Sequence, residues 1–185
     1  GCFLVKVQSA GAGRVTAAQF VNNTVHAIGD HARTNMNNER IKFGNKWGTV
    51  ASPGIIKNNI ITQDASGTAT TFSIDVGDIA TLTVDYSLYG AANNRWKWGS
   101  SAATTSFSTW KSNSSQDANS PTPADPLFIA SPTNLHLTGT SPAKDAGVTL
   151  GDFTTDLDGV TRPVGAAWDI GAYEYDAGGP TPTVT

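Results

Sequence analysis

The sequence predicts an all-β fold of the solenoid kind, in which short strands from successive repeats stack on one another. One observation is a repeat: FVNNTVH (20–26) recurs as IKNNIIT (56–62) and more loosely as TVDYSLY (83–89), at offsets of 36 and 27 residues. The other is composition: 38% apolar and 15% charged residues in a chain of 185, with Gly, Ser, Thr and Asn making up the difference. Such a balance is typical of strands and turns and does not suit a helical bundle.

The three copies of the repeat align in columns of similar residues. The columns join Phe20 with Ile56 and Thr83, Asn22 with Asn58 and Asp85, and Val25 with Ile61 and Leu88. Asn at one place in successive turns can form a side-chain ladder along the stack, and Asn tolerates the left-handed bends between short strands. The alignment therefore predicts stacked strands with an Asn ladder between them.

The chain is expected to form one domain over residues 1–175, followed by a Pro/Thr linker at 176–185. Residues 1–90 would hold the coils, and 91–175 the last coil and a terminal cap, because an uncovered last coil exposes a strand edge. The segment SFSTWKSN (106–113) is a helix candidate, with Ser106 or Ser108 as its N-cap.

Several longer motifs carry a resemblance to a known family. The most specific are QDANS (116–120), SPAKDAG (141–147) and DLDGVTRPVGAAWDIGAYEY (156–175). With their surroundings, from about 55 to 175, they resemble the C-terminal half of bacterial right-handed parallel β-helix repeat proteins, the pectate-lyase-like superfamily. The resemblance implies a right-handed parallel β-helix whose closing stretch is a terminal cap. It leaves the function open among lyases, hydrolases, carbohydrate-binding modules and adhesins.

The closing stretch also crowds carboxylates, which raises the question of a metal site or an acid–base pair. The calcium candidates are Asp152, Asp156 and Asp158, but the D-x-D-G pattern makes a good turn as well, and the bidentate Glu that ends a calcium loop is absent. Arg162 is expected to pair with one of these carboxylates inside the cap. No cofactor is predicted beyond this calcium candidate.

Sugar recognition is the sharper hypothesis, and it rests on the stretch NNRWKWG. Alternate residues of a strand share a face, so Trp96 and Trp98 would present both indoles together. Indoles stack on sugar rings, and charged neighbours bind hydroxyls. The full set of carbohydrate-binding candidates is Trp47, Arg95, Trp96, Lys97 and Trp98. The alternative is that these rings pack under loops, which is also expected for Trp110 and Trp168.

These features predict a non-catalytic, extracellular or cell-surface module that binds polysaccharide and belongs to a larger protein. A uronate polysaccharide lyase or a glycoside hydrolase is one alternative. The candidate lyase bases (Arg40, Lys42, Lys46 and Lys57) and acid partners (Asp75 and Asp78) are not fixed together by any motif. An adhesive or filament protein stacking end to end is another alternative.

Charge and hydropathy exclude other classes of function. A net charge of −3 without a basic stretch makes nucleic acid an unlikely partner, and no apolar run is long enough to span a membrane. The single cysteine, Cys2, cannot form a disulfide within the chain.

Overall fold

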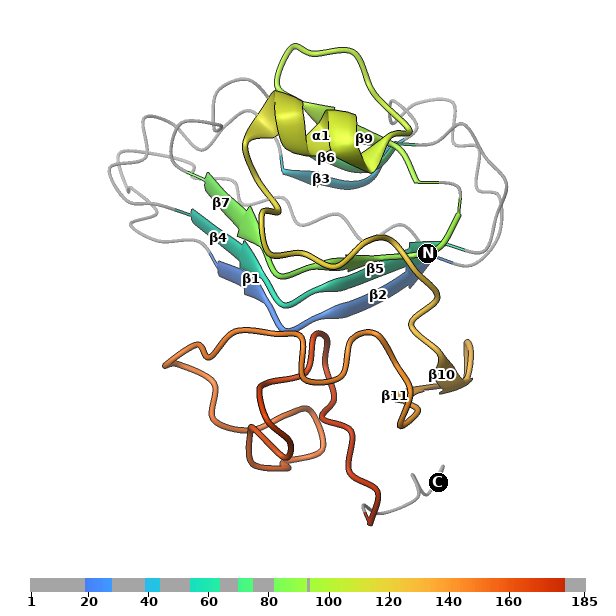
Figure 1. The fold of residues 1–185 in the computed structure, drawn as a ribbon, viewed down its shortest axis with the longest axis vertical. Coiled ribbons are helices and arrows are strands. Elements are labelled where there is room, and N and C mark those ends of the chain that lie inside the picture. The colour runs from blue at the N-terminus through green and yellow to red at the C-terminus, as the bar shows by residue number, and fades with distance from the viewer. Residues whose placement is uncertain are drawn as a thin grey trace, which may run out of the picture.

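The computed structural model describes residues 19–27, 39–43, 54–63, 70–74, 82–92 and 94–178 (Figure 1). Within them, short strands form three parallel sheets, and each sheet is made of every third strand along the chain. The first sheet is β1 (Gln19–Val21), β4 (Gly54–Lys57) and β7 (Leu82–Asp85); the second is β2 (Thr24–Ala27), β5 (Ile60–Gln63) and β8 (Leu88–Tyr89); the third is β3 (Glu39–Phe43), β6 (Thr70–Ile74) and β9 (Trp96–Trp98). Each successive repeat therefore adds one parallel strand to each sheet.

One helix and two further strands follow the third sheet. Helix α1 (Phe107–Ser114) packs against β9, and Ser106 caps it by accepting a hydrogen bond from the N–H of Thr109. The helix expected at 106–113 is thus confirmed, with Ser106 as its N-cap. Strands β10 (Phe128–Ala130) and β11 (Asn134–Leu137) form an antiparallel pair.

The predicted fold class, a right-handed parallel β-helix with a terminal cap, is wrong. The strands have two to five residues each and lie in separate sheets of two or three strands, and no closed coil can be traced through the described residues. Residues 138–178, here called the terminal segment, are turns and bends held by side chains rather than the last coil of a solenoid. Stacking of repeats alone did not establish a solenoid.

The register of the strands confirms the first repeat alignment and corrects the second. Phe20 lies opposite Ile56 and Val25 opposite Ile61, as the columns predict. In the third copy Ile56 faces Val84, so the predicted partner Thr83 is displaced by one residue. Because a one-residue shift exchanges the two faces of a strand, Val84 is buried and Thr83 is exposed.

The core lies in the space that the three sheets surround in Figure 1. It is rich in aromatic rings. Its members are Phe20, Ile56, Ile61, Phe72, Leu82, Val84, Tyr89, Trp96, Trp98 and Trp110. The rings of Phe72 and Trp110 meet edge to face with centroids 5.7 Å apart, so α1 closes this core through Trp110. Edge-to-face contacts of this kind stabilise beyond the area they bury.

The edge of the last strands is covered by residues 116–124, which follow α1. The N–H of Val84 donates to Gln116 Oε1 at 2.7 Å, and the N–H of Asp117 donates to the carbonyl of Val84 at 2.8 Å. The N–H of Ser87 donates to Ser120 Oγ at 2.9 Å. We call 116–124 the covering segment, because it supplies partners that a further parallel strand would otherwise provide.

The sequence predicts that the terminal segment covers the end of the stack. In the structure it packs instead on the outer face of the second sheet. Ile60 and Leu88 point outward from β5 and β8 and form a second core with Leu137, Ala143 and Ile170. Figure 1 shows this segment on the side of the first two sheets opposite the third. Two outward-facing apolar side chains explain its position, since they must be shielded from water.

The contact is closest at Gly171, whose φ of 108° suits glycine. A Cβ at this position would lie 2.7 Å from Cδ1 of Ile60 and 2.8 Å from Oγ1 of Thr24. The N–H of Gly171 donates to the carbonyl of Asn58 at 2.8 Å. The backbone of the terminal segment thus touches the corner between the first two sheets.

Asn58 occupies that corner, and its side chain is the junction between repeats and terminal segment. Its Nδ2 donates to Oδ1 of Asn22 at 3.0 Å and to the carbonyl of Val148 at 2.7 Å, while its Oδ1 accepts from the N–H of Val148 at 2.9 Å. Both Asn residues have left-handed backbones, with φ of 55° and 56°. The predicted Asn ladder is confirmed for Asn22 and Asn58, which share one hydrogen bond. In the third copy of the repeat, Tyr86 with φ of 53° takes the left-handed position instead of Asp85.

We expect Asn58→Ala to lower the free energy of unfolding by about 4 kcal/mol. The change removes side-chain hydrogen bonds worth about 1 kcal/mol each and places Ala in a left-handed conformation that costs about another 1 kcal/mol. Urea unfolding measures the effect. Asn22→Ala is the matched control and should cost about 2 kcal/mol, because it places Ala in the same left-handed conformation but loses only one of the three hydrogen bonds of Asn58. Equal losses in the two variants would contradict the role given to Asn58.

Candidate functional site

The two tryptophans expected to stack on sugars lie in the core. Trp96 is 1% exposed and Trp98 is 9% exposed. Trp96 meets Tyr89 edge to face at 5.4 Å, and Trp98 meets Trp110 at 5.6 Å. The two rings share a face of β9, as predicted, but that face is the inner one. The prediction that they form a sugar-binding surface is therefore wrong.

The neighbours of these rings do not restore the site. Arg95 and Lys97 are half-buried beside β9, and the N–H of Phe72 donates to the carbonyl of Arg95 at 3.3 Å. Trp47 lies outside the described residues, as do the lyase candidates Lys46, Asp75 and Asp78. Trp110 and Trp168 are buried, as expected. Among the described residues, the stretch RWKW therefore offers no exposed indole.

The three calcium candidates have different partners and do not converge. Asp152 accepts from Nε2 of Gln19, Asp156 is buried and accepts from backbone N–H groups, and Asp158 contacts His136. Within the ranges that the structure describes, no group of three or more His, Cys, Asp or Glu side chains is placed to hold a metal ion.

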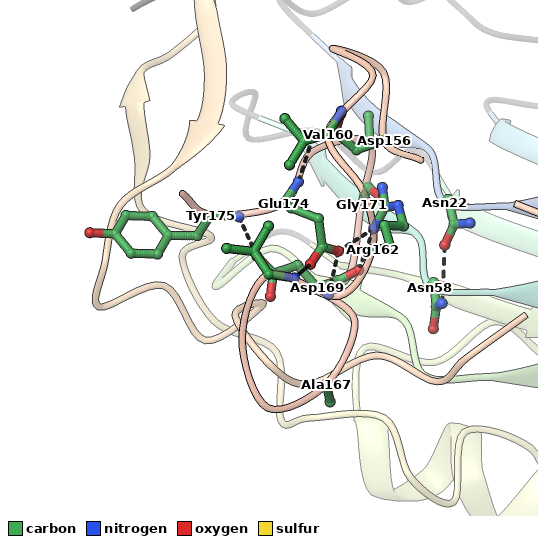
Figure 2. Close-up of polar contacts among 12 residues, drawn as sticks. Asn22, Asn58, Asp156, Val160, Arg162, Ala167, Asp169, Gly171, Glu174 and Tyr175 are labelled. Atoms are coloured by element: carbon green, nitrogen blue, oxygen red, sulfur yellow. Dashed lines mark hydrogen bonds and ion pairs between the residues drawn. The ribbon is translucent and has the colours of Figure 1, made fainter. Parts of the chain in front are cut away.

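The remaining charges of the terminal segment form a buried network (Figure 2). Nη1 of Arg162 contacts Oε1 of Glu174 at 2.6 Å, and the two side chains are 1% and 0% exposed. Nη2 of Arg162 donates to the carbonyl of Gly171 at 2.9 Å. Arg162 is thus paired inside the terminal segment as predicted, but with Glu174 instead of one of the three candidate aspartates.

The carboxylates of this network bind backbone N–H groups. Glu174 accepts from the N–H groups of Asp169 and Val164 at 2.9 and 3.0 Å. Asp156 accepts from the N–H of Val160 at 2.8 Å and from that of Glu174 at 2.9 Å. In a segment without regular strands these contacts replace ladder hydrogen bonds, so the carboxylates are structural.

Asp169 is the member of this network with a clear change in acidity. Burial raises its pKa to about 6, although the N–H groups of Asp145 and Tyr175, which donate to it at 2.7 and 2.5 Å, favour the charged form. Asp169 therefore changes charge in a pH range where an exposed aspartate is already ionised.

The group that does reach the surface is a polar and aromatic cluster on β11 and the terminal segment. We call Asn134, His136, Asp158 and Tyr173 the hairpin cluster. Nε2 of His136 lies 2.7 Å from Oδ2 of Asp158, and the imidazole stacks on the phenol of Tyr173 with centroids 3.9 Å apart. Side-chain exposure is 18% for His136 and 37% for Asp158, so the cluster is open to solvent.

The hydrogen bonds within the hairpin cluster fix the orientation of its groups. Oδ1 of Asn134 accepts from the backbone N–H of His136 at 3.0 Å, which identifies it as the oxygen. Nδ1 of His136 lies 2.7 Å from the same oxygen and therefore carries the hydrogen. Burial, followed by the charges of Asp158 and Asp156, raises the pKa of Tyr173, so its hydroxyl remains a donor at neutral pH.

No sequence motif indicates the hairpin cluster. His136 and Asp158 lie 22 positions apart in the sequence and are not linked by a motif or a characteristic spacing. The cluster arises because the terminal segment folds back beside β11, which only the tertiary structure shows.

Comparison with protein-family models, with curated proteins and with solved structures found no match for this chain. The resemblance to β-helix repeat proteins in its motifs therefore stays a prediction. None of the helices in the described part of the chain is long and apolar enough to cross a membrane.

We expect Glu174→Ala to lower the free energy of unfolding by about 3–5 kcal/mol, because it leaves the guanidinium of Arg162 buried without its counter-charge. Guanidinium chloride or urea titration measures the loss. The double variant Arg162→Met/Glu174→Met should recover part of it, since no uncompensated charge then remains. A double variant less stable than the single one would contradict this explanation.

The raised pKa of Asp169 predicts a direction for stability against pH. The folded form holds its proton up to about pH 6 while the unfolded form loses it near the ordinary value of 3.8. Between these values the native state binds more protons, so the contribution of this group to stability falls as pH rises from about 4 to about 6. Asp169→Asn should flatten this part of the curve of unfolding free energy against pH. An unchanged slope would contradict the assignment, whatever the absolute stability of the variant.

Proposed function

We propose that this chain is a polysaccharide-binding module of a larger extracellular protein, and that the hairpin cluster is its binding surface. The observation that carries the proposal is the solvent-open placement of an aromatic pair, His136 on Tyr173, beside the half-exposed carboxylate of Asp158. Rings and carboxylates in one place match what a sugar presents, namely an apolar C–H face with hydroxyl groups around it.

The carboxylate of Asp158 supports the proposal because one of its two oxygens can accept a further hydrogen bond. Its Oδ2 faces His136, and no hydrogen bond to its Oδ1 occurs among the described residues. A carboxylate oxygen of this kind accepts hydrogen bonds from sugar hydroxyls. Leu157, the residue before it, is 71% exposed, and its N–H donates to the carbonyl of Ala172, the residue before Tyr173.

The charge around Tyr173 favours a neutral glycan over a uronate. Burial, followed by the negative charges of Asp158 and Asp156, raises the pKa of its phenol, so both carboxylates lie near the ring. The same negative charges would repel the carboxylates of a uronate polymer. The surface therefore fits neutral hexose or pentose chains better than the uronate polymers on which a polysaccharide lyase would act.

The filament alternative loses support at one end of the stack. The covering segment takes hydrogen-bonding groups of Val84 and Ser87 that a stacked copy would need. This argument does not bear on a role in binding, because the hairpin cluster belongs to β11 and the terminal segment and uses neither Val84 nor Ser87.

We expect Tyr173→Ala and Asp158→Asn each to weaken binding of a neutral polysaccharide by about 10-fold or more, as for central residues of other binding surfaces. A glycan array identifies the ligand, and isothermal titration measures the affinity. Asp152→Asn is the matched control, since it alters an exposed carboxylate bound to Gln19 and should leave affinity unchanged. Tight binding that survives both cluster variants would place the glycan elsewhere and refute this site.

A further inference from the structure

A second polar group lies at the turn of the β10–β11 pair, where Ser131 meets His26. Oγ of Ser131 is 3.1 Å from Nε2 of His26, although 105 residues separate them in sequence. Nδ1 of the same imidazole is 2.7 Å from Oγ1 of Thr62. One ring thus joins a hydroxyl on each side.

The parallel register of β2 and β5 builds half of this arrangement. His26 and Thr62 are direct partners in that ladder, so their side chains leave the sheet side by side. Thr62 is 6% exposed, and its hydroxyl is therefore held in one place under the ring. In the next repeat Gly90 follows the paired strand, and a Cβ there would come within 3.4 Å of Thr62.

The β10–β11 pair supplies the other half. The ring of Phe128 on β10 meets the imidazole edge to face, at 6.3 Å and 85°, and fixes its plane. Ser131 follows β10 directly and is exposed, so its hydroxyl is open to a ligand while it contacts the histidine. The arrangement is a reactive hydroxyl, a base and a group that orients the base, which is the logic of an activated nucleophile.

We propose that Ser131 is a nucleophile activated by His26, that Thr62 positions the imidazole, and that the site cleaves carboxylic esters of small acyl groups. This activity goes beyond the proposed glycan binding and does not depend on it. His26 and Ser131 touch the reacting atoms, whereas Thr62 acts through His26.

The chemical steps balance with water as the second reactant. Oγ of Ser131 bonds to the carbonyl carbon of the ester as its proton passes to Nε2 of His26, and the alcohol leaves with that proton. Water then attacks the acyl-serine, giving its proton to His26, and the carboxylic acid leaves as Ser131 regains its hydrogen. During both steps Nδ1–H donates to Thr62. Because a neutral hydroxyl stabilises an imidazolium less than a carboxylate does, turnover is slow and covalent labelling is the sensitive measurement.

The test is labelling of the full chain with a fluorophosphonate probe, in which Oγ of Ser131 displaces fluoride from phosphorus. Mass spectrometry of the digested protein should place the label on Ser131, and p-nitrophenyl acetate should be hydrolysed in parallel. Ser131→Ala should abolish both signals. His26→Gln should slow labelling by about 100-fold, the size of a general-base contribution. Thr62→Val should slow it less, and Thr62→Ser should restore it.

Controls separate reactivity from folding. Ser100→Ala removes another exposed serine hydroxyl and should change nothing. Every variant is compared with the wild type by near-ultraviolet circular dichroism. If His26→Gln fails to fold, Ser131→Cys provides the measurement instead: iodoacetamide should alkylate it at least 10-fold faster than it alkylates Ser100→Cys. A label on other residues, equal alkylation of the two cysteines, or no labelling of the folded wild type would overturn the proposal.

Discussion

The side-chain amide of Asn58 is the contact on which the remaining arrangement depends. It is fully buried, and it ties the first two repeats together through Asn22 while holding Val148 of the terminal segment by two hydrogen bonds. An amide can do both because it carries donors and an acceptor in one plane. Losing the two bonds to Val148 would leave the terminal segment attached by its apolar contact with Ile60 and Leu88 and by the backbone N–H groups of Gly171 and Ala172. The position of Tyr173 and Asp158 on the surface follows from this attachment.

The terminal segment obtains its order from charge instead of regular structure. Besides its backbone–backbone hydrogen bonds, many of its N–H groups donate to side chains, and Asp156, Asp169 and Glu174 accept several of these bonds. Only one of these carboxylates faces a cation, Arg162. Buried charges of this kind are weak contributors to net stability, but each requires a particular arrangement of its neighbours. The segment is therefore specified by geometry more than by the area it buries.

Sequence patterns predicted which residues act together more reliably than where they lie. The period of two placed Trp96 and Trp98 on one face, but a period cannot tell the inner face from the outer. The third repeat was displaced by one residue, because Thr83 and Val84 are equally suited to strands and no glycine or proline marks the boundary. Stacked repeats were read as a solenoid, although the structure contains separate short sheets. The contacts of His26 and His136 depend on chain folding over long separations, which no local pattern encodes.

The covering segment has a consequence for how this architecture changes in length. Its contacts fit one edge: Gln116 and Asp117 bind Val84, and Ser120 binds Ser87. A repeat added after β8 would separate these partners and expose polar groups on both sides. A repeat duplicated upstream of β7 would leave them intact. Growth or shortening of such chains, in evolution or by design, is therefore expected to occur among the early repeats, with residues 82–124 inherited as one unit.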